Sequence, residues 1–481
     1  MINSNKRNNF LYLFVVLAFS FMYLPSYVNA QTVDDKPKKE IKYRKARSLS
    51  SKVAKKMAKV YEALEAVNEQ GEPSPDMETV NEILSDLLNQ KDDIKSYDRS
   101  IMWNALAYVY TTEEKYLEAI EAFENLLDEP ESTIPLRNEA LRSLGRLHVG
   151  LENFQTGIKY ILRYMDVVET VTAQTWALLG RVYYTTGEFK KALSSLEKAV
   201  ILAEEEGYKP KENWYSVMAA SIGELKAEIG EKEAYLRQIA IYEILVNLYP
   251  KKTYFIQLGG IYGQLGREKD YMITLKAAYA KDLLNREGEY QTLAQLLLLN
   301  QNPYWAAQVL VSGQQKIITY NETKIDEITG EEIKVEKTGP VIKSNEKNLK
   351  LIADSWRMAQ EIDKAIPVLA KAAELSKDGK AYVLLGNLYL GEDKIEKAVD
   401  AIKKGLKKGK IEKISQVHLT LGQAYFELQK FEEAKKEFRI AARDKDKKTK
   451  SMANNWIKYT ENEEIRVKNL ALRRDFIQSQ S

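Results

Sequence analysis

The sequence predicts an all-α solenoid of about nine to ten helical hairpins, closed by capping helices at both ends. Three observations indicate this fold. A pattern of large apolar and small residues recurs along most of the chain. Acidic and basic residues alternate in most segments, as they do on exposed helix faces. Finally, 481 residues are too many for one compact core, yet only 11 Pro and 23 Gly are present to interrupt helices.

The clearest copy of the recurring pattern begins at Trp176. Leu179, Gly180 and Tyr183 follow on the same first helix, and Ala192 begins the matching pattern on a second helix. Residues three or four apart share one face of a helix, so the large side chains form a stripe. The small residue after the leucine lets the two helices approach closely. Seven further copies in the same frame begin at Trp103, Leu141, Phe255, Tyr290, Leu349, Tyr382 and His418.

This pattern resembles the tetratricopeptide repeat, which has Trp, Leu, Gly and Tyr at these spacings on its first helix. The resemblance implies hairpins stacked into a right-handed superhelix, with a concave face lined by the first helix of each hairpin. A ninth copy, between Trp214 and Tyr249, is degenerate. Its second helix begins about two helical turns later in the sequence than in the other copies, so we expect longer helices in this hairpin.

The repeats and their interruptions divide the chain into segments. Residues 320–343 abandon the helical period for isolated apolar residues such as Ile333 and Val335, with a turn around Gly330. We therefore expect a two-stranded hairpin or a mobile loop there. The segments are an atypical helix pair at 51–100, repeats at 101–318, this insertion at 319–345, repeats at 346–447, and a capping helix with a tail at 448–481.

The first 30 residues have the features of a secretory signal peptide. Lys6 and Arg7 precede an almost wholly apolar stretch at 10–24, and small residues favour cleavage after Ala30. The apolar stretch is short for a membrane span, and an uncleaved anchor is the alternative. Residues 31–50 are then a basic, flexible arm, either solvated or in contact with a membrane surface or a partner. These features predict a periplasmic protein.

The composition disfavours several classes of chemistry. The chain has no cysteine and only two histidines, so a structural zinc site or a Ser-His-Asp triad has little to build on. His148 and His418 occupy motif positions, where we expect partly buried packing residues. The glycines between Gly259 and Gly266 lack the Gly-Lys-Ser/Thr ending of a phosphate loop. We therefore expect no enzymatic activity, no cofactor and no structural metal, and a net charge of +3 argues against a nucleic-acid partner.

Exposed positions on the first helices of the early repeats form a candidate peptide groove. Three of them are arginines, and guanidinium groups bind carboxylates through paired hydrogen bonds, which favours an acidic segment or a chain terminus as ligand. The carboxylate clamp of the family uses Lys and Asn instead, and this chain does not reproduce it, so a merely solvated face is the alternative. The candidate residues are Asn104, Tyr108, Arg142, Arg146, Arg181 and Tyr184.

The order of features also resembles the periplasmic tetratricopeptide proteins of gammaproteobacteria that are associated with TonB-ExbB-ExbD systems. The similarity lies in the signal, in residues 52–88, in residues 96–99 leading into Trp103, and in residues 210–215 and 248–252. It implies a non-enzymatic scaffold for protein partners, including TonB-complex components, that assists the uptake of iron carriers. An envelope or cell-wall assembly factor is the alternative function.

Overall fold

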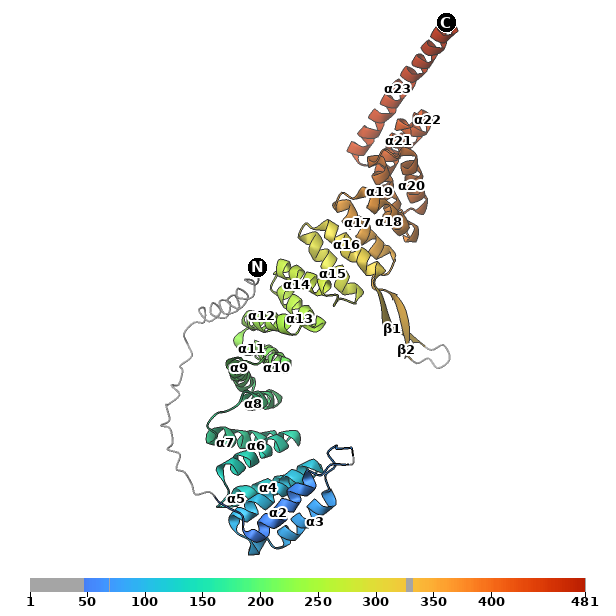
Figure 1. Cartoon of the computed structure of the whole chain (residues 1–481). Coiled ribbons are helices and arrows are strands. Elements are labelled where there is room, and N and C mark those ends of the chain that lie inside the picture. Colours follow the sequence, from blue (N-terminus) through green and yellow to red (C-terminus); the bar gives the residue numbers. More distant parts are fainter. Residues whose placement is uncertain (1–46, 69, 326–331, 481) are drawn as a thin grey trace, which may run out of the picture. The chain divides into compact units, whose positions relative to one another are not determined.

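The computed structural model describes residues 47–68, 70–325 and 332–480, and these residues are mostly helical (Figure 1). They form 22 α-helices, one 3-10 helix and one two-stranded sheet. The chain divides into two compact units between Ala140 and Leu141. The all-α fold of helical hairpins predicted from the repeating pattern is confirmed. The predicted signal peptide, its cleavage site after Ala30 and the basic arm up to residue 46 lie outside the described residues.

The first unit contains two helical hairpins, the first of which is the atypical pair. Val53, Met57 and Val60 are buried at spacings of three and four, which is the apolar stripe that pairs the first two helices. The side chain of Asp76 accepts a hydrogen bond from the amide of Thr79 at 3.1 Å and so caps the second helix. The helices are α2 (Ser51–Leu64), α3 (Met77–Asn89), α4 (Ser96–Thr112) and α5 (Tyr116–Asp128), with the 3-10 helix η1 (Lys91–Asp93) before α4.

The remaining helices follow one another as further hairpins and end in a single long helix (Figure 1). They are α6 (Ile134–Gly150), α7 (Phe154–Val167), α8 (Ala173–Thr185), α9 (Phe189–Glu205), α10 (Glu212–Glu224), α11 (Lys226–Ile229), α12 (Glu231–Leu248), α13 (Lys252–Gln264), α14 (Glu268–Ala280), α15 (Glu287–Leu299), α16 (Pro303–Gln315), α17 (Glu346–Met358), α18 (Ile362–Leu375), α19 (Lys380–Gly391), α20 (Ile395–Lys408), α21 (Ile414–Glu427), α22 (Phe431–Ala441) and α23 (Lys447–Ser479).

One backbone turn recurs between the two helices of eight hairpins. In each of them, a residue with positive φ follows the first helix. The amide of the residue after it donates a hydrogen bond to the carbonyl of the motif residue that is Tyr183 in the clearest copy. In that copy the donor is the amide of Glu188, at 2.8 Å. This is the left-handed helix ending that normally favours glycine. Only Gly187 and Gly266 meet that preference. The other six left-handed positions are Glu114, Glu152, Gln301, Gln360, Asp393 and Gln429.

The close approach predicted at the small motif residue is present. A Cβ atom built on Gly180 would lie 2.7 Å from Cγ of Leu196 and 3.1 Å from the carbonyl oxygen of Ala192, both on the facing helix. Leu196 and Ala192 are fully buried. Absence of a side chain at Gly180 therefore sets the separation of α8 and α9.

The degenerate hairpin differs from the prediction in where its extra residues lie. α10 has 13 residues, as α13 does, whereas α12 has 18, so the expectation of longer helices is wrong for the first helix. The excess forms the four-residue α11, which ends at Gly230 with φ of 88°. Since only glycine adopts this conformation without strain, Gly230 lets the chain reverse before α12 begins.

Strands β1 (Ile317–Ile325) and β2 (Glu332–Pro340) form an antiparallel hairpin between α16 and α17 (Figure 1). The predicted turn around Gly330 lies outside the described residues. The base of the hairpin is fastened to the helices, because the amide of Ile342 donates to the carbonyl of Gly313 at 3.0 Å. Val341 and Ile342 are also buried in the core of the neighbouring repeats.

Helix α23 packs on α22 through its first half, and it continues to Ser479 through the part of residues 448–481 that was expected to be a tail. The ring of Trp456 stacks on Phe438 with 5.6 Å between centroids. Lys435 of α22 is nearly buried and bonds to Glu464 of α23 at 2.7 Å, and Glu464 also bonds to Lys468. The hydrogen bonds from Lys435 and Lys468 lower the pKa of Glu464 to about 2.

This shift predicts a pH-dependent attachment of α23. A carboxyl group whose folded-state pKa is lowered contributes stability above its unfolded-state pKa, and this stability is lost as the pH falls through the folded-state value. We therefore expect Glu464→Gln to lower the unfolding midpoint at neutral pH. The difference from the unaltered protein should shrink as the pH falls below about 4.5 and should disappear near pH 2. Urea unfolding followed by circular dichroism measures it, with Glu461→Gln on the exposed side as the control, and a pH-independent difference would contradict the assignment.

Candidate peptide-binding site

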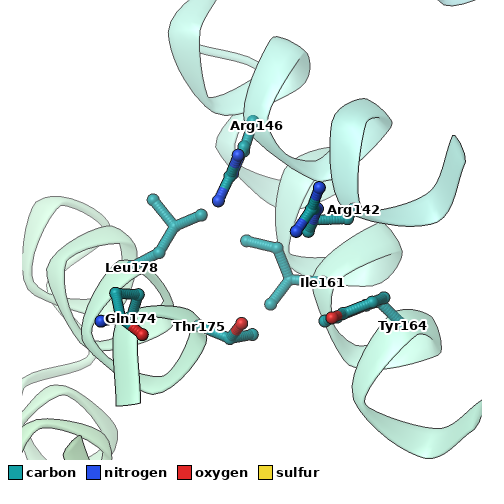
Figure 2. A pocket seen from close by; sticks show the side chains of 7 residues that line it. All are labelled: Arg142, Arg146, Ile161, Tyr164, Gln174, Thr175 and Leu178. Carbon is teal, nitrogen blue, oxygen red and sulfur yellow. The ribbon is translucent and has the colours of Figure 1, made fainter. Parts of the chain in front are cut away.

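A pocket of about 290 Å³ lies on three successive helices, α6, α7 and α8, and all of its lining residues belong to the second unit (Figure 2). Its cationic side is made by Arg142 and Arg146 of α6. Figure 2 shows both guanidinium groups pointing toward the space between Ile161 of α7 and Leu178 of α8. Tyr164, Gln174 and Thr175 complete the lining.

The helix period explains why these side chains meet. Arg142 and Arg146 are four residues apart and so lie on one face of α6. Leu141 and Leu144 occupy a different face and are buried, which leaves the arginines toward the pocket. Arg146 is exposed and forms no ion pair with another described residue.

The N-terminal turn of α8 adds to the positive potential of the pocket. Thr172 is its N-cap, and its side-chain oxygen accepts from the amide of Thr175 at 3.3 Å. The neighbouring Gln174 donates through its side-chain amide to the Tyr208 hydroxyl at 3.1 Å, which holds that end of the pocket in place. The first turn of a helix carries partial positive charge. This charge therefore adds to that of the two guanidinium groups, and both favour an anion in the pocket.

The structure brings together two of the six candidate residues. Arg181 is exposed on α8 but does not line the pocket, and Tyr184 is half-buried against the ring of Phe189, 5.6 Å away. Asn104 and Tyr108 lie on α4 of the first unit, where Asn104 is half-buried and Tyr108 is 57% exposed.

Sequence reasoning missed the residues that α8 contributes. In the repeat that begins at Leu141, the two candidate positions lie one and five residues after the first motif residue. In the structure, Arg142 and Arg146 share the pocket with three residues of the next repeat, whose first motif residue is Trp176. The three residues lie two before, one before and two after Trp176. Those residues are Gln174, Thr175 and Leu178. Comparing neighbouring repeats at these offsets is the signal that would have found them.

The two histidines are half-buried in different surroundings. The ring of His148 stacks on Tyr160 with centroids 5.4 Å apart, as expected of a packing residue. Nδ1 of His418 lies 2.5 Å from a carboxylate oxygen of Glu437, a polar contact that the motif position did not indicate.

Metal-binding clusters and membrane-spanning helices are both absent from the part of the chain that the structure describes. Within residues 47–68, 70–325 and 332–480, there is no group of three or more His, Asp or Glu side chains that could hold a metal ion. None of the helices in this described part combines the length and the apolar character needed to cross a membrane.

Comparison with known proteins identifies the repeat. The model of the tetratricopeptide repeat family matches residues 101–131, 173–205, 379–407 and 415–442. The protein CTR9 homolog of Arabidopsis thaliana is 23% identical over 351 residues, which cover 68% of this chain but only 30% of that protein. The chain thus spans less than a third of the length of this relative.

Solved structures of other repeat proteins are similar at low sequence identity. A tetratricopeptide repeat protein from Parabacteroides merdae is 14% identical with a TM-score of 0.24, covering 60% of this chain and 98% of that one. The TPR2AB domain of yeast Sti1, solved in complex with pHSP90, is 13% identical with a TM-score of 0.28, covering 60% and 97%. From the matched segments and the repeated hairpins, the chain contains tetratricopeptide repeats and has their all-α fold.

Proposed function

We propose that this protein is a protein-interaction scaffold that binds an acidic segment of a partner in the pocket formed by α6, α7 and α8. The observation that carries the proposal is the pair Arg142 and Arg146, whose guanidinium groups point into one pocket. Tetratricopeptide repeats support the general role, because their stacked hairpins present extended surfaces for protein partners.

The lining of the pocket matches the two parts of a glutamate or aspartate side chain. A guanidinium group can donate two parallel hydrogen bonds to a carboxylate. The first turn of α8 also favours the negative charge of the carboxylate. Ile161 is buried and Leu178 half-buried, so both offer apolar surface to the methylene groups of the ligand. At about 290 Å³ the pocket is at the lower end of ligand-site sizes, which suits one side chain or a chain terminus.

Reversing the charge of the pocket should abolish this binding. In the double variant Arg142→Glu, Arg146→Glu, we expect the affinity for a fluorescein-labelled peptide of alternating Glu and Leu to fall about 100-fold or more. The reason is the loss of two charge-assisted hydrogen-bonded pairs, each of which contributes ~1.5 kcal/mol. Fluorescence polarisation measures the affinity, and circular dichroism checks that helicity is unchanged.

The matched control makes the same change in net charge outside the pocket. Arg163→Glu with Arg181→Glu alters two exposed arginines on α7 and α8 that do not line it. This control should retain affinity to within a few-fold. An equal loss in both double variants would mean that binding follows net charge alone, and the pocket would be rejected as the site.

For the cellular setting, we propose a periplasmic protein that assists a TonB-type uptake system. The support is the predicted secretory signal in residues 1–30 and the resemblance in the order of sequence features. Mass spectrometry of protein isolated from a bacterial periplasm should find a chain that begins at Gln31. Crosslinking there should recover TonB, ExbB or ExbD with the unaltered protein and less with Arg142→Glu, Arg146→Glu. Recovery of none of them would rule out this partner and leave the peptide-binding test unaffected.

A further inference from the structure

A second pocket, of about 400 Å³, lies in the first unit on α3, α4 and α5. It belongs to a different part of the chain from the pocket lined by Arg142 and Arg146. The charged residues that line it have the opposite net charge, which is negative. Leu88, Trp103 and Tyr110 line it as buried or half-buried residues, and the exposed Glu118, Glu121 and Lys91 form its rim. The function proposed above makes no use of any of these residues.

Two aromatic rings supply the wall of this pocket. Trp103 and Tyr110 are seven residues apart on α4, which is about two helical turns, so they lie on the same face. Trp103 is 9% exposed and Tyr110 is half-buried, so each ring is held by the core and still reaches the pocket. The face of an aromatic ring attracts a cation, and Trp attracts it most strongly.

The two carboxylates of the rim take part in no ion pair among the described residues. Glu118 and Glu121 are exposed, lie one turn apart on α5, and pair with no described cation. α5 contains no Lys or Arg, and the adjacent Lys115 is bonded to Glu113 at 2.8 Å, so its charge interacts with Glu118 less than with Glu113. Like charges at this spacing repel one another and destabilise a helix. A cation that enters the pocket would relieve this repulsion. Lys91 also lines the pocket, so the lining residues together carry one net negative charge.

We propose that this pocket binds a lysine or arginine side chain of a partner polypeptide. The cationic head lies against the rings of Trp103 and Tyr110 and pairs with the carboxylates of Glu118 and Glu121. Its methylene stem covers Leu88 and the buried Ala122, as long cationic side chains commonly do on apolar surface. The protein then has two recognition sites of opposite preference, an acidic segment at α6–α8 and a basic one at α3–α5.

The test uses the purified protein and a fluorescein-labelled peptide of alternating Lys and Ala. Glu118→Gln with Glu121→Gln should weaken binding at least about tenfold, and it should not lower the melting temperature, because a repulsion is removed. Glu78→Gln with Glu82→Gln makes the same charge change at exposed positions of α3 outside the pocket and should leave the affinity within about twofold. Tyr110→Phe keeps the ring and should bind normally, whereas Tyr110→Leu should lose several-fold.

Three results would overturn the proposal. The first is equal weakening by the two double variants, which would reduce binding to a general charge effect. The second is normal binding by Tyr110→Leu in a folded protein. The third is at least tenfold tighter binding after deletion of residues 36–45, which would make the basic stretch of the chain itself the occupant, not a partner. The acidic-peptide assay is expected to be unchanged in every one of these variants, so the two proposals fail or stand separately.

Discussion

Replacing Gly379 with alanine is expected to destabilise the α19–α20 hairpin by about 2–4 kcal/mol. A Cβ atom on Gly379 would lie 2.0 Å from the carbonyl oxygen of Gly405 and 2.7 Å from its carbonyl carbon. Both are backbone atoms of α20, so no side chain can rotate away. The amide of Gly379 also donates to the carbonyl of Gly409 at 2.8 Å, which holds the two segments together. The added methyl group must therefore separate the helices or break this bond.

Gly391→Ala is the matched control for this prediction. Gly391 ends the same helix, and a Cβ there would meet nothing within 4 Å. Alanine has the higher helix propensity, so this variant should be neutral or slightly more stable. Thermal and urea unfolding followed by circular dichroism compare the midpoints, since a repeat protein need not unfold in two states. Similar midpoints for the two variants would show that the helices tolerate the methyl group.

Phe438→Ala is expected to cost about 3–5 kcal/mol and to release α23 from the end of the stack. The Phe438 side chain is fully buried, and its ring stacks on Trp456 of α23. It also fills the space left by Gly422, where a Cβ would lie 2.5 Å from the ring. Removing the ring therefore opens a cavity at the point where α21, α22 and α23 meet.

Limited proteolysis with mass spectrometry measures this release directly. Cleavage sites within α23 should become accessible in Phe438→Ala at protease concentrations that leave the unaltered protein intact. Phe476→Ala, on the same helix but 61% exposed, removes an identical group without opening a cavity and should leave the cleavage pattern unchanged. If α23 stayed protected in Phe438→Ala, Trp456 and the Lys435–Glu464 contact would be sufficient to hold it.

The hairpins were predictable from the sequence because each is a local structure with its own signal. The stripe that includes Leu179 and the small residue Gly180 lie within one hairpin, and the structure has both where the spacing predicts them. The extra helix α11 was not predicted, because its four residues are too few to show a period. The left-handed turn at Glu114 was also not predicted, since a glutamate gives no sign of positive φ.

The two pockets were harder to predict than the fold. Arg142 and Arg146 were predicted from their exposed positions on the first helix of one repeat, but Gln174 and Leu178 line the pocket from the next repeat. A contact between repeats depends on how the hairpins stack, which the residues of one copy do not encode. Trp103 of the second pocket was assigned only to the core from its motif position, yet its ring also lines a cavity.

The repeated left-handed turn bears on how this protein can be engineered. Six of its eight copies hold a glutamate, glutamine or aspartate where glycine would be free of steric strain. Each strained residue costs on the order of 1 kcal/mol, partly offset by the entropy that glycine loses on folding. The turns lie in different hairpins and share no partners, so their contributions should add. The chain thus offers six independent positions for raising thermal tolerance in small steps without altering a residue that lines either pocket.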